Sequence, residues 1–338
     1  MTDTTATDSP IKPGGRSLLA GASAQLGLLA IILLFGLVFW LQAPGFLSKL
    51  NLFNLGRSLA IDIVIGFSQM VVLATGGMNL AVGSIGVCAV MAAGWMLQDL
   101  GLPIPVTIAG ALALGGVLGW LNGFAIVKTG VNAFIITLAS ASLFSGAMLI
   151  LTKAVPYNGL PAEIGAFGRL RIEGYVSPLL LIAIAIGLAL VVLYRTTALG
   201  REILAAGANP RAAAMSGVPV DRVIVVSHVL SGLLAAAAGL MVVARLGTAS
   251  PATVGDDWLL PSFLGPVLGG TLLSGGNIAV VGTMLGAALV TTLRSGLLVL
   301  QIGSFWLQLF LGVILLLAVM ADRYRGVFVE RRRLGRRG

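Results

Sequence analysis

Residues 24–42 read AQLGLLAIILLFGLVFWLQ, a stretch that contains no charged side chain. A helix needs about 20 mostly apolar residues to cross the hydrocarbon core of a bilayer. The stretch is too long for the apolar part of a typical signal peptide, and the residues before it are mostly polar and small. It therefore predicts a first membrane-spanning helix, entered from the cytoplasmic side after Lys12 and Arg16.

The composition of the whole chain gives the same answer. Of its 338 residues, 58% are hydrophobic and only 10% are charged, whereas a soluble domain averages about 25% charged residues. The surface of a soluble protein cannot be built from this sequence. Because spanning segments must satisfy their own backbone hydrogen bonds, we expect an all-α, polytopic bundle of transmembrane helices.

Further apolar runs follow the first one along the chain. The ten candidate spans are 24–42, 58–76, 82–98, 104–127, 131–152, 177–195, 222–244, 258–272, 279–297 and 303–321. The run 258–272 is short and contains Pro261 and Pro266, so it is expected to be a re-entrant or broken helix, and the count is nine or ten. No soluble domain is expected beside the transmembrane domain, 24–322, which lies between a cytoplasmic N-terminal tail, 1–23, and a basic tail, 323–338.

Charged residues gather at the edges of the apolar runs. The chain has 21 Lys and Arg against 12 Asp and Glu, a net charge of +9. Seven arginines lie in the last 16 residues, and Arg195, Arg201, Arg211 and Arg222 lie in or directly beside the loop 196–221. This pattern indicates topology determinants and contacts with lipid headgroups, and no nucleic-acid partner is expected. Both termini and loop 196–221 are expected in the cytoplasm, and loop 153–176 outside.

The sequence lacks the motifs of several enzyme classes. It contains no Walker A sequence, no G-x-S-x-G and no H-E-x-x-H. Its single cysteine, Cys88, and single histidine, His228, do not form a metal-binding pattern. We therefore expect no enzyme activity, no metal and no cofactor.

Polar residues within the spans are candidates for a solute path. Asp62 is expected near the membrane interface, exposed toward the headgroups or paired with Arg57. Uncharged polar residues lie in or at the edges of four central spans: Ser68, Gln69, Thr75, Asn79, Asn122, Asn132, Thr137, Ser140, Ser142 and Ser145. As a group they suit a neutral, hydroxyl-rich solute, although each one could instead hold helices together.

Glycines form two further patterns. Gly115, Gly119 and Gly123 are spaced four residues apart, as are Gly282 and Gly286, which predicts close helix packing. Residues 76–85, GGMNLAVGSI, also resemble residues 269–278, GGTLLSGGNI, at five of ten positions. Duplicated halves with interrupted helices are common in transporters, but a glycine-rich chain can produce such a likeness by chance, so both interpretations stay open.

The inner loop contains a helix signal of its own. Asn209 is a good N-cap, Pro210 suits the first helical position, and Gly217 can end the helix. The sequence therefore predicts a short helix over 210–216, Ala-rich and cytoplasmic. A helix this short is marginal alone and would be stabilised by docking in a groove of another protein, the interpretation that we favour over a plain connector.

At this loop the chain resembles a known family. GREILAAGANPRAAAMSGVPVDR, residues 200–222, is similar to the coupling loop in the permease subunits of ribose-type bacterial ABC importers. Four further segments match in order: TGGMNLAVGS (75–84), FIITL (134–138), LGGTLLSGG (268–276) and FWLQLFLGVILLLAVMAD (305–322). The family usually has Asp and Ser where Asn79 and Ala81 stand, Glu where Arg211 stands, and Tyr-Glu-Leu where residues 256–258 read Asp-Asp-Trp.

The resemblance implies a permease subunit in the bacterial cytoplasmic (inner) membrane that imports a monosaccharide or similar neutral solute. The implied partners are ABC ATPase subunits, a periplasmic or lipid-anchored substrate-binding protein, and a second permease chain, the same or related. The residues expected to couple to the ATPase are Gly200, Arg201, Glu202, Gly207, Asn209, Pro210, Arg211, Ala212, Ala213, Ser216 and Gly217. The candidates for the translocation path are Gln69, Thr75, Asn79, Asn132, Phe134, Thr137 and Ser140. The alternative is a self-sufficient secondary transporter or facilitator, and a membrane scaffold or enzyme has no supporting motif.

Overall fold

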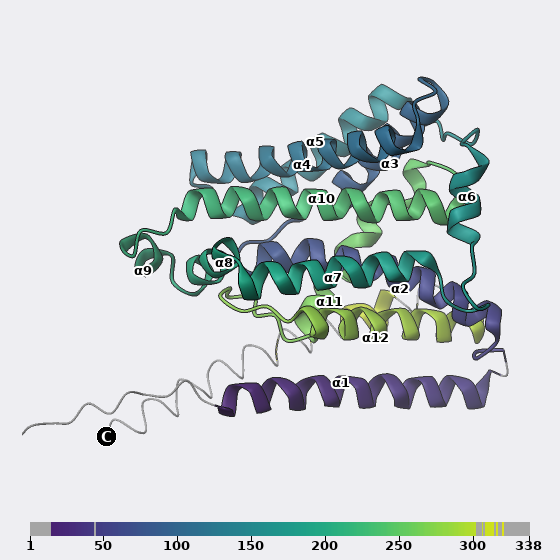
Figure 1. The fold of residues 1–338 in the computed structure, drawn as a ribbon, viewed down its shortest axis with the longest axis horizontal. Helices are drawn as coiled ribbons and strands as arrows, with labels where there is room; N and C mark the ends of the chain where they lie inside the picture. Colours follow the sequence, from purple (N-terminus) through teal and green to yellow (C-terminus); the bar gives the residue numbers. More distant parts are fainter. Residues whose placement is uncertain are drawn as a thin grey trace, which may run out of the picture.

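The computed structural model describes residues 15–43 and 45–301, together with 306, 308–313, 316 and 320. These residues are almost entirely helical, as expected. The long helices lie side by side in one bundle, with α8 and α9 at one end and α6 at the other (Figure 1). In the described part of the chain, seven helices are long and apolar enough to cross a membrane.

The seven long helices fall on predicted spans. They are α1 (Gly15–Gln42), α2 (Lys49–Leu73), α4 (Ile104–Thr129), α5 (Ala133–Thr152), α7 (Pro178–Thr196), α10 (Val220–Leu246) and α12 (Val280–Val299). Two shorter apolar helices, α3 (Val82–Gln98) and α11 (Leu259–Leu268), match the predictions for 82–98 and 258–272. The tenth predicted span, 303–321, lies largely outside the described residues, although 308–313 are helical.

Two helices begin earlier than their apolar runs. α1 starts at Gly15, within the predicted N-terminal tail, and α2 starts at Lys49 instead of residue 58. Ser48 caps α2, because its Oγ accepts from the Asn51 backbone N–H at 3.3 Å. The prediction was wrong here because it followed hydrophobicity, whereas a helix can continue through polar turns at the membrane surface.

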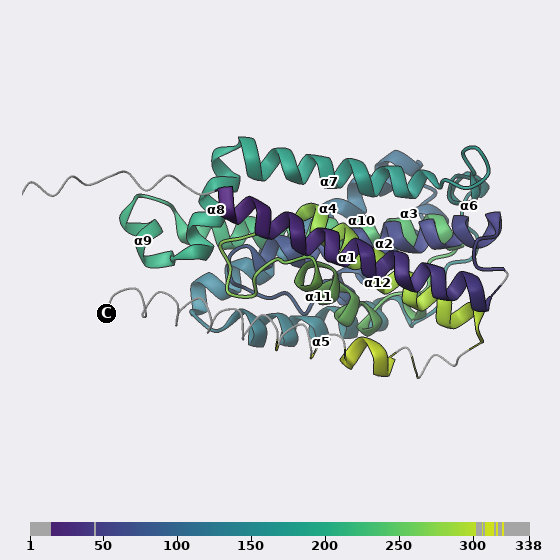
Figure 2. The ribbon, with the colours of Figure 1, turned by 90° about the horizontal axis from the view of Figure 1, so that it is seen from below.

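Helix α2 lies at the centre of the bundle. It packs against α7, α10, α11 and α12, and most of its side chains are buried. Helix α1, in contrast, lies at the edge against α12, as the view from below makes clear (Figure 2). The central position explains how α2 accommodates Asp62, Ser68 and Gln69, since polar side chains in a membrane protein face the bundle interior.

The predicted glycine rows do bring helices together. Along α4, Cβ atoms added at Gly115, Gly119 and Gly123 would collide with the backbone of α10. Gly286 on α12 likewise leaves no room for a side chain against Gly265 of α11. In lipid, where apolar burial between helices gives little driving force, this close approach supplies the packing contacts that hold a bundle together.

Two stretches interrupt the helices inside the bundle. Residues 74–81, the first break, separate α2 from α3, and residues 269–279, the second break, separate α11 from α12. Near the start of each lies a glycine of positive φ, Gly76 at +77° and Gly270 at +92°, a conformation in which other residues are strained. The two similar sequence segments thus lie at corresponding helix breaks, and α11 is the short, Pro266-containing helix that was expected.

Both long loops contain helices that were not predicted. The loop 153–176 carries α6 (Ala162–Arg169), which packs across the end of α10. The loop 196–221 carries α8 (Ala198–Ala208) in addition to the expected α9 (Pro210–Met215). Both new helices are short and only partly apolar, so the search for spans passed over them.

Candidate functional site

The first half of the inner loop forms α8. Thr197 caps the helix, because its Oγ1 accepts from the Gly200 backbone N–H at 3.1 Å. Ile203 and Ala206 are buried beneath it, while Arg201 is exposed and its Nη1 donates to Thr196 O at 3.3 Å. Helix α8 is therefore packed onto the bundle as part of its structure and is not a free connector.

The second half of the loop forms α9. Asn209 Oδ1 accepts from the Ala212 backbone N–H at 3.1 Å, as its role as N-cap requires. Pro210 occupies the first helical position, and Gly217 follows the helix with φ +82°. The predicted short helix is confirmed, as are its N-cap Asn209, its first residue Pro210 and the glycine that follows it, Gly217.

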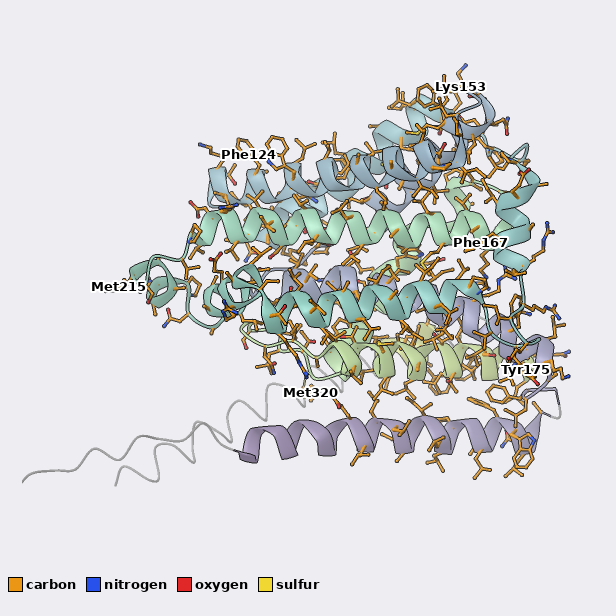
Figure 3. All side chains as sticks on the ribbon, in the orientation of Figure 1. Phe124, Lys153, Phe167, Tyr175, Met215 and Met320 are labelled. Carbon is orange, nitrogen blue, oxygen red and sulfur yellow. The ribbon has the colours of Figure 1, made fainter. Side chains whose placement is uncertain are left out.

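Helix α9 projects from the end of the bundle (Figure 3). Met215 at its tip is 91% exposed, and Arg211 and Ser216 are also exposed. Ala213 is only 5% exposed and packs inward. A projecting helix of six residues with an exposed methionine is suited to docking in a groove of another protein.

The residues expected to couple to the ATPase divide by position. Those on the outer surface are Arg201, Asn209, Pro210, Arg211, Ala212, Ser216 and Gly217. Gly200, Gly207 and Ala213 are buried, and Glu202 is partly buried. The exposed members are accessible to a partner, whereas the buried members pack within the chain.

The end of α8 meets both helix breaks. The Gly276 backbone N–H donates to Ala74 O at 2.9 Å and so ties the second break to the first. A Cβ at Gly207 would collide with Ala74 O and would lie 2.6 Å from Gly276 N. A Cβ at Gly275 would lie 2.8 Å from Gly207 O and 2.6 Å from Gly76 N. We call this contact of Ala74, Gly76, Gly207, Gly275 and Gly276 the glycine junction.

The glycine junction was not found from the sequence. The sequence contains the glycine pairs 76–77 and 275–276, but nothing local linked them to each other or to Gly207. In the structure the loop 196–221 contacts both helix breaks through Gly207. A movement of α8 would therefore reach both breaks without passing along a whole helix.

Buried polar residues hold the first break in place. Ser68 Oγ donates to Ser231 O at 2.8 Å, and Asn79 Nδ2 donates to Ser231 Oγ at 2.8 Å. With its amide oriented to satisfy both groups, Gln69 donates to Asn79 O at 2.8 Å and accepts from Asn79 N at 3.3 Å. Thr137 Oγ1 accepts from the Leu80 N–H at 3.1 Å. The bonds to the backbone of Asn79 and Leu80 replace helical hydrogen bonds that the break loses, and those to Ser231 tie α2 and the break to α10.

The candidates for the path are therefore not equivalent. Gln69, Asn79 and Thr137 are buried and hydrogen-bonded, so in this conformation they support the break. Thr75 and Ser140 are partly exposed, and Asn132 and Phe134 on the outer face of α5 are exposed. Ser231, which bonds to both Ser68 and Asn79, is a member of the buried group that sequence reasoning missed.

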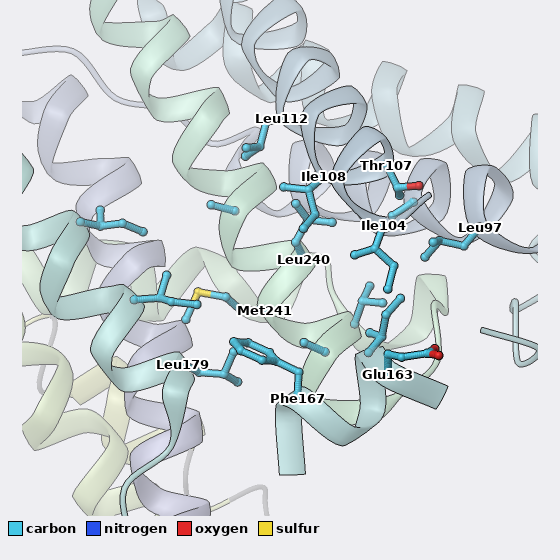
Figure 4. Close-up of a pocket in the computed structure, with 17 residues that line it drawn as sticks. Leu97, Ile104, Thr107, Ile108, Leu112, Glu163, Phe167, Leu179, Leu240 and Met241 are labelled. Atoms are coloured by element: carbon cyan, nitrogen blue, oxygen red, sulfur yellow. The ribbon is translucent and has the colours of Figure 1, made fainter. Parts of the chain in front are cut away.

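A groove of about 620 Å³ lies over α10, between α4 and α7, and is closed at one end by α6 (Figure 4). Its walls are apolar, with Ile108, Leu179 and Met241 among them, and Glu163 at the rim is the acidic residue of the lining. A neutral, hydroxyl-rich solute needs hydrogen-bond partners along its way. The groove is therefore unsuited to be the translocation path.

The sequence suggested that Asp62 is exposed toward the headgroups or pairs with Arg57, but the structure shows neither. Its carboxylate lies 3.4 Å from Arg294 Nη1 and accepts from Thr291 Oγ1 at 2.8 Å. Asp62 is only 4% exposed, and Arg57 instead donates to Arg245 O. The prediction was wrong because Asp62 faces the interior of the bundle, where α12 supplies both partners.

The fold points to a class: a membrane transport subunit with interrupted helices in its bundle and a short helix projecting at one end. Residues 51–320 match the family model described as branched-chain amino acid transport system / permease component. The chain belongs to this family and is a permease subunit of an ABC importer, a multi-pass protein of the bacterial inner membrane.

Relatives of known role are similar over most of their length. The chain is 37% identical to the ribose import permease protein RbsC of Bacillus subtilis, over 88% of its own length and 91% of that protein. It is 35% identical to RbsC of Escherichia coli K12, over 88% and 93%. It is 31% identical to LsrD, the autoinducer 2 import system permease protein of Salmonella typhi, over 81% and 84%. No solved structure matches.

Membership of this family also shows that ATP hydrolysis by a partner supplies the energy for transport. Permease components of ABC importers have no ATPase activity of their own and work with ATPase and binding-protein partners. The resemblance drawn from the coupling loop is thereby confirmed. The alternative of a self-sufficient secondary transporter loses its support.

Proposed function

We propose that this chain conducts ribose, or a closely related monosaccharide, across the cytoplasmic membrane. The observation that carries the proposal is its 37% and 35% identity to two ribose import permeases over 88% of the chain. The identity to the autoinducer 2 permease is lower, 31%. Both kinds of solute are small and polar, so only a direct measurement separates them.

The proposal places α8, α9 and both termini in the cytoplasm. Lys128, Arg195, Arg201, Arg211 and Arg222 belong to the same end of the bundle as α8 and α9, and cytoplasmic loops of membrane proteins are rich in Lys and Arg. Helix α1 also begins at this end (Figure 1). The binding protein then delivers the sugar at the opposite end, near α6.

In the proposed mechanism, α9 docks in a groove of the ATPase subunit. ATP binding brings the two ATPase subunits together, and α9 moves with the subunit that holds it. Helix α8 follows, because one residue, Asn209, separates the two helices, and its end presses on both breaks at the glycine junction. The result is a shift of population between inward-facing and outward-facing states, driven by their different affinities for the partners.

The proposed path runs between two permease chains, identical or related. The outer face of α5 supports this arrangement, because Phe134, Ile135 and Leu138 are exposed there, beside the partly exposed Ser140. Asn132 and Thr75 offer polar groups near the same end of the bundle. Gln69, Asn79 and Thr137 lie behind this face, where a rearranged first break would present them to the sugar.

The test is transport by the reconstituted complex. The tagged chain is purified in a mild detergent with the ATPase that accompanies it, placed in proteoliposomes and supplied with its binding protein. We expect uptake of radiolabelled ribose that requires ATP hydrolysis and is competed by excess unlabelled ribose.

Two results would contradict the proposal, one about the energy source and the other about the substrate. Equal uptake by the chain without ATPase would restore the self-sufficient transporter. ATP-dependent uptake of autoinducer 2, with ribose neither carried nor competing, would keep the importer but change its substrate. As a control, a non-hydrolysable ATP analogue replaces ATP, which separates the effect of ATP binding from that of ATP hydrolysis.

A further inference from the structure

At the end of the bundle opposite α9, arginines from three elements converge. Arg57 lies on α2, Arg245 lies in the last turn of α10, and Arg169 and Arg171 lie at the end of α6 and just beyond it. Arg57 is within electrostatic reach of the other three guanidinium groups. We call these four residues the arginine cluster.

The arginine cluster is held by specific contacts. Arg57 Nη2 donates to Arg245 O and so caps the end of α10. The guanidinium carbons of Arg57 and Arg171 lie 5.3 Å and 4.8 Å from the ring centroid of Phe53, which is buried. One aromatic ring therefore positions two cations from separate parts of the chain, and α6 holds Arg169 nearby through Arg169 Nε and Gly165 O at 3.0 Å.

Negative charge in the protein balances this group only in part, because Asp62 is the carboxylate within electrostatic reach of Arg245 in the described structure and is already paired with Arg294. Within the described residues, the salt bridge of the structure joins Arg294 to Asp62, whose carboxylate also accepts from Thr291. None of the four cluster arginines has a carboxylate within salt-bridge distance there. The ends of α6 and α10 each contribute about half a negative charge at most. Several positive charges therefore remain without compensation.

The most buried member adds an unsatisfied donor. Arg57 is 9% exposed, and its Nε is buried without a hydrogen-bond partner in the described structure. A buried cation beside three like charges is costly unless an anion lies nearby. The cluster thus combines excess charge with an unused N–H group at one place.

We propose that the arginine cluster binds a phosphate-type oxyanion. Guanidinium groups offer paired N–H donors that match phosphate oxygens and, unlike ammonium groups, remain planar and oriented. The cluster lies where helices α2 and α10 reach the end of the bundle, the level at which lipid phosphates are found. The oxyanion is either the phosphate of an anionic lipid headgroup or free phosphate, and the proposal does not depend on the transported solute.

The first test uses inorganic phosphate and the delipidated full-length chain in detergent. Thermal unfolding is followed by tryptophan fluorescence in phosphate and in chloride at equal ionic strength. We expect phosphate to raise the unfolding midpoint more than chloride does. Because Arg169 and Arg171 are exposed, Arg169→Gln and Arg171→Gln should fold normally and weaken apparent phosphate affinity by about fivefold each.

The matched control is Arg222→Gln, which removes the same charge from an exposed residue at the other end of the bundle. It should respond to phosphate as the unaltered chain does. The proposal is overturned if phosphate does not raise the unfolding midpoint of the unaltered chain, or raises it equally in all variants. The exception is a bound lipid headgroup, which the measurement below would detect.

The second test identifies the source of the oxyanion. The chain is placed in nanodiscs of phosphatidylglycerol or phosphatidylcholine, extracted gently, and the lipids that remain bound are counted by native mass spectrometry. Retention of phosphatidylglycerol that falls in Arg169→Gln and Arg171→Gln would assign a lipid headgroup. Phosphate stabilisation without lipid retention would assign a free oxyanion, and the absence of both would reject the site.

Discussion

At Gly207 the absence of a side chain allows helix α8 to contact both helix breaks. Gly207 lies within helix α8, where alanine would be the better residue on helix propensity alone. Its place at the glycine junction excludes a side chain, because Ala74 O and Gly276 N occupy the space. The residue thus favours contact between segments over local helix stability.

Replacement of this glycine tests the junction directly. Gly207→Ala should lower the number of sugar molecules carried per ATP hydrolysed by roughly tenfold or more, because the methyl group must displace one of the breaks. ATP hydrolysis should persist, since the exposed face of α9 is unchanged. The measurement is parallel uptake and phosphate release in proteoliposomes.

The control for this change is Gly146→Ala on α5, where an added Cβ would meet no atom within 4 Å. It should leave the ratio of uptake to hydrolysis unaltered. The amount of assembled complex is measured for both variants, so that poor assembly is separated from poor coupling. An unchanged ratio in assembled Gly207→Ala would show that the junction does not transmit the motion.

Helix α9 is the element that we propose to dock on the ATPase. Its cap, its first-position proline and its terminal glycine make it a defined helix despite its length. The face that packs inward carries Ala213, and the face that points away carries Met215. A substitution meant to disturb docking therefore belongs at Met215, whereas one at Ala213 would disturb the loop itself.

Met215→Asp should weaken the association of the chain with its ATPase by about tenfold or more, since it places a charge where an apolar anchor would dock. Folding should not change, because the side chain is 91% exposed. Co-purified ATPase per chain is the quantity to measure, with Met215→Leu as the variant that retains an apolar side chain. Full ATPase recovery with Met215→Asp would remove this residue from the docking surface.

The ends of helices within the apolar spans were easier to predict than the ends of helices at the membrane surface. Spans such as α3 were placed to the residue, because their ends coincide with a change from apolar to polar sequence. Helix α2 was cut short, and α6 and α8 were missed, because helices at the surface need caps and tertiary contacts more than hydrophobicity. Thr197 and Ser48 carried those signals as N-caps.

For the whole molecule, the arrangement of charges predicts how the bundle is inserted. In a Cys88→Ser background, Lys153→Cys and Met215→Cys place single thiols on exposed residues at opposite ends (Figure 3). A membrane-impermeant maleimide should label Lys153→Cys on intact cells and Met215→Cys only after permeabilisation. The reason is that the segments expected on the α9 side, with both tails included, hold 14 Lys and Arg against 6 on the other side. The reverse labelling would invert the proposed topology.

The sequence by itself determined the membrane class, the run of spans, helix α9 and the likeness to ribose-type permeases. These follow from local properties: the length of an apolar run, a cap, a glycine after a helix. Only the tertiary structure decided that Asp62 pairs with Arg294, that Gly207 meets both breaks, and that Arg57 joins a cluster of arginines. Each of these joins segments far apart in the chain, and their meeting depends on how the helices pack, which hydrophobicity in lipid does not specify.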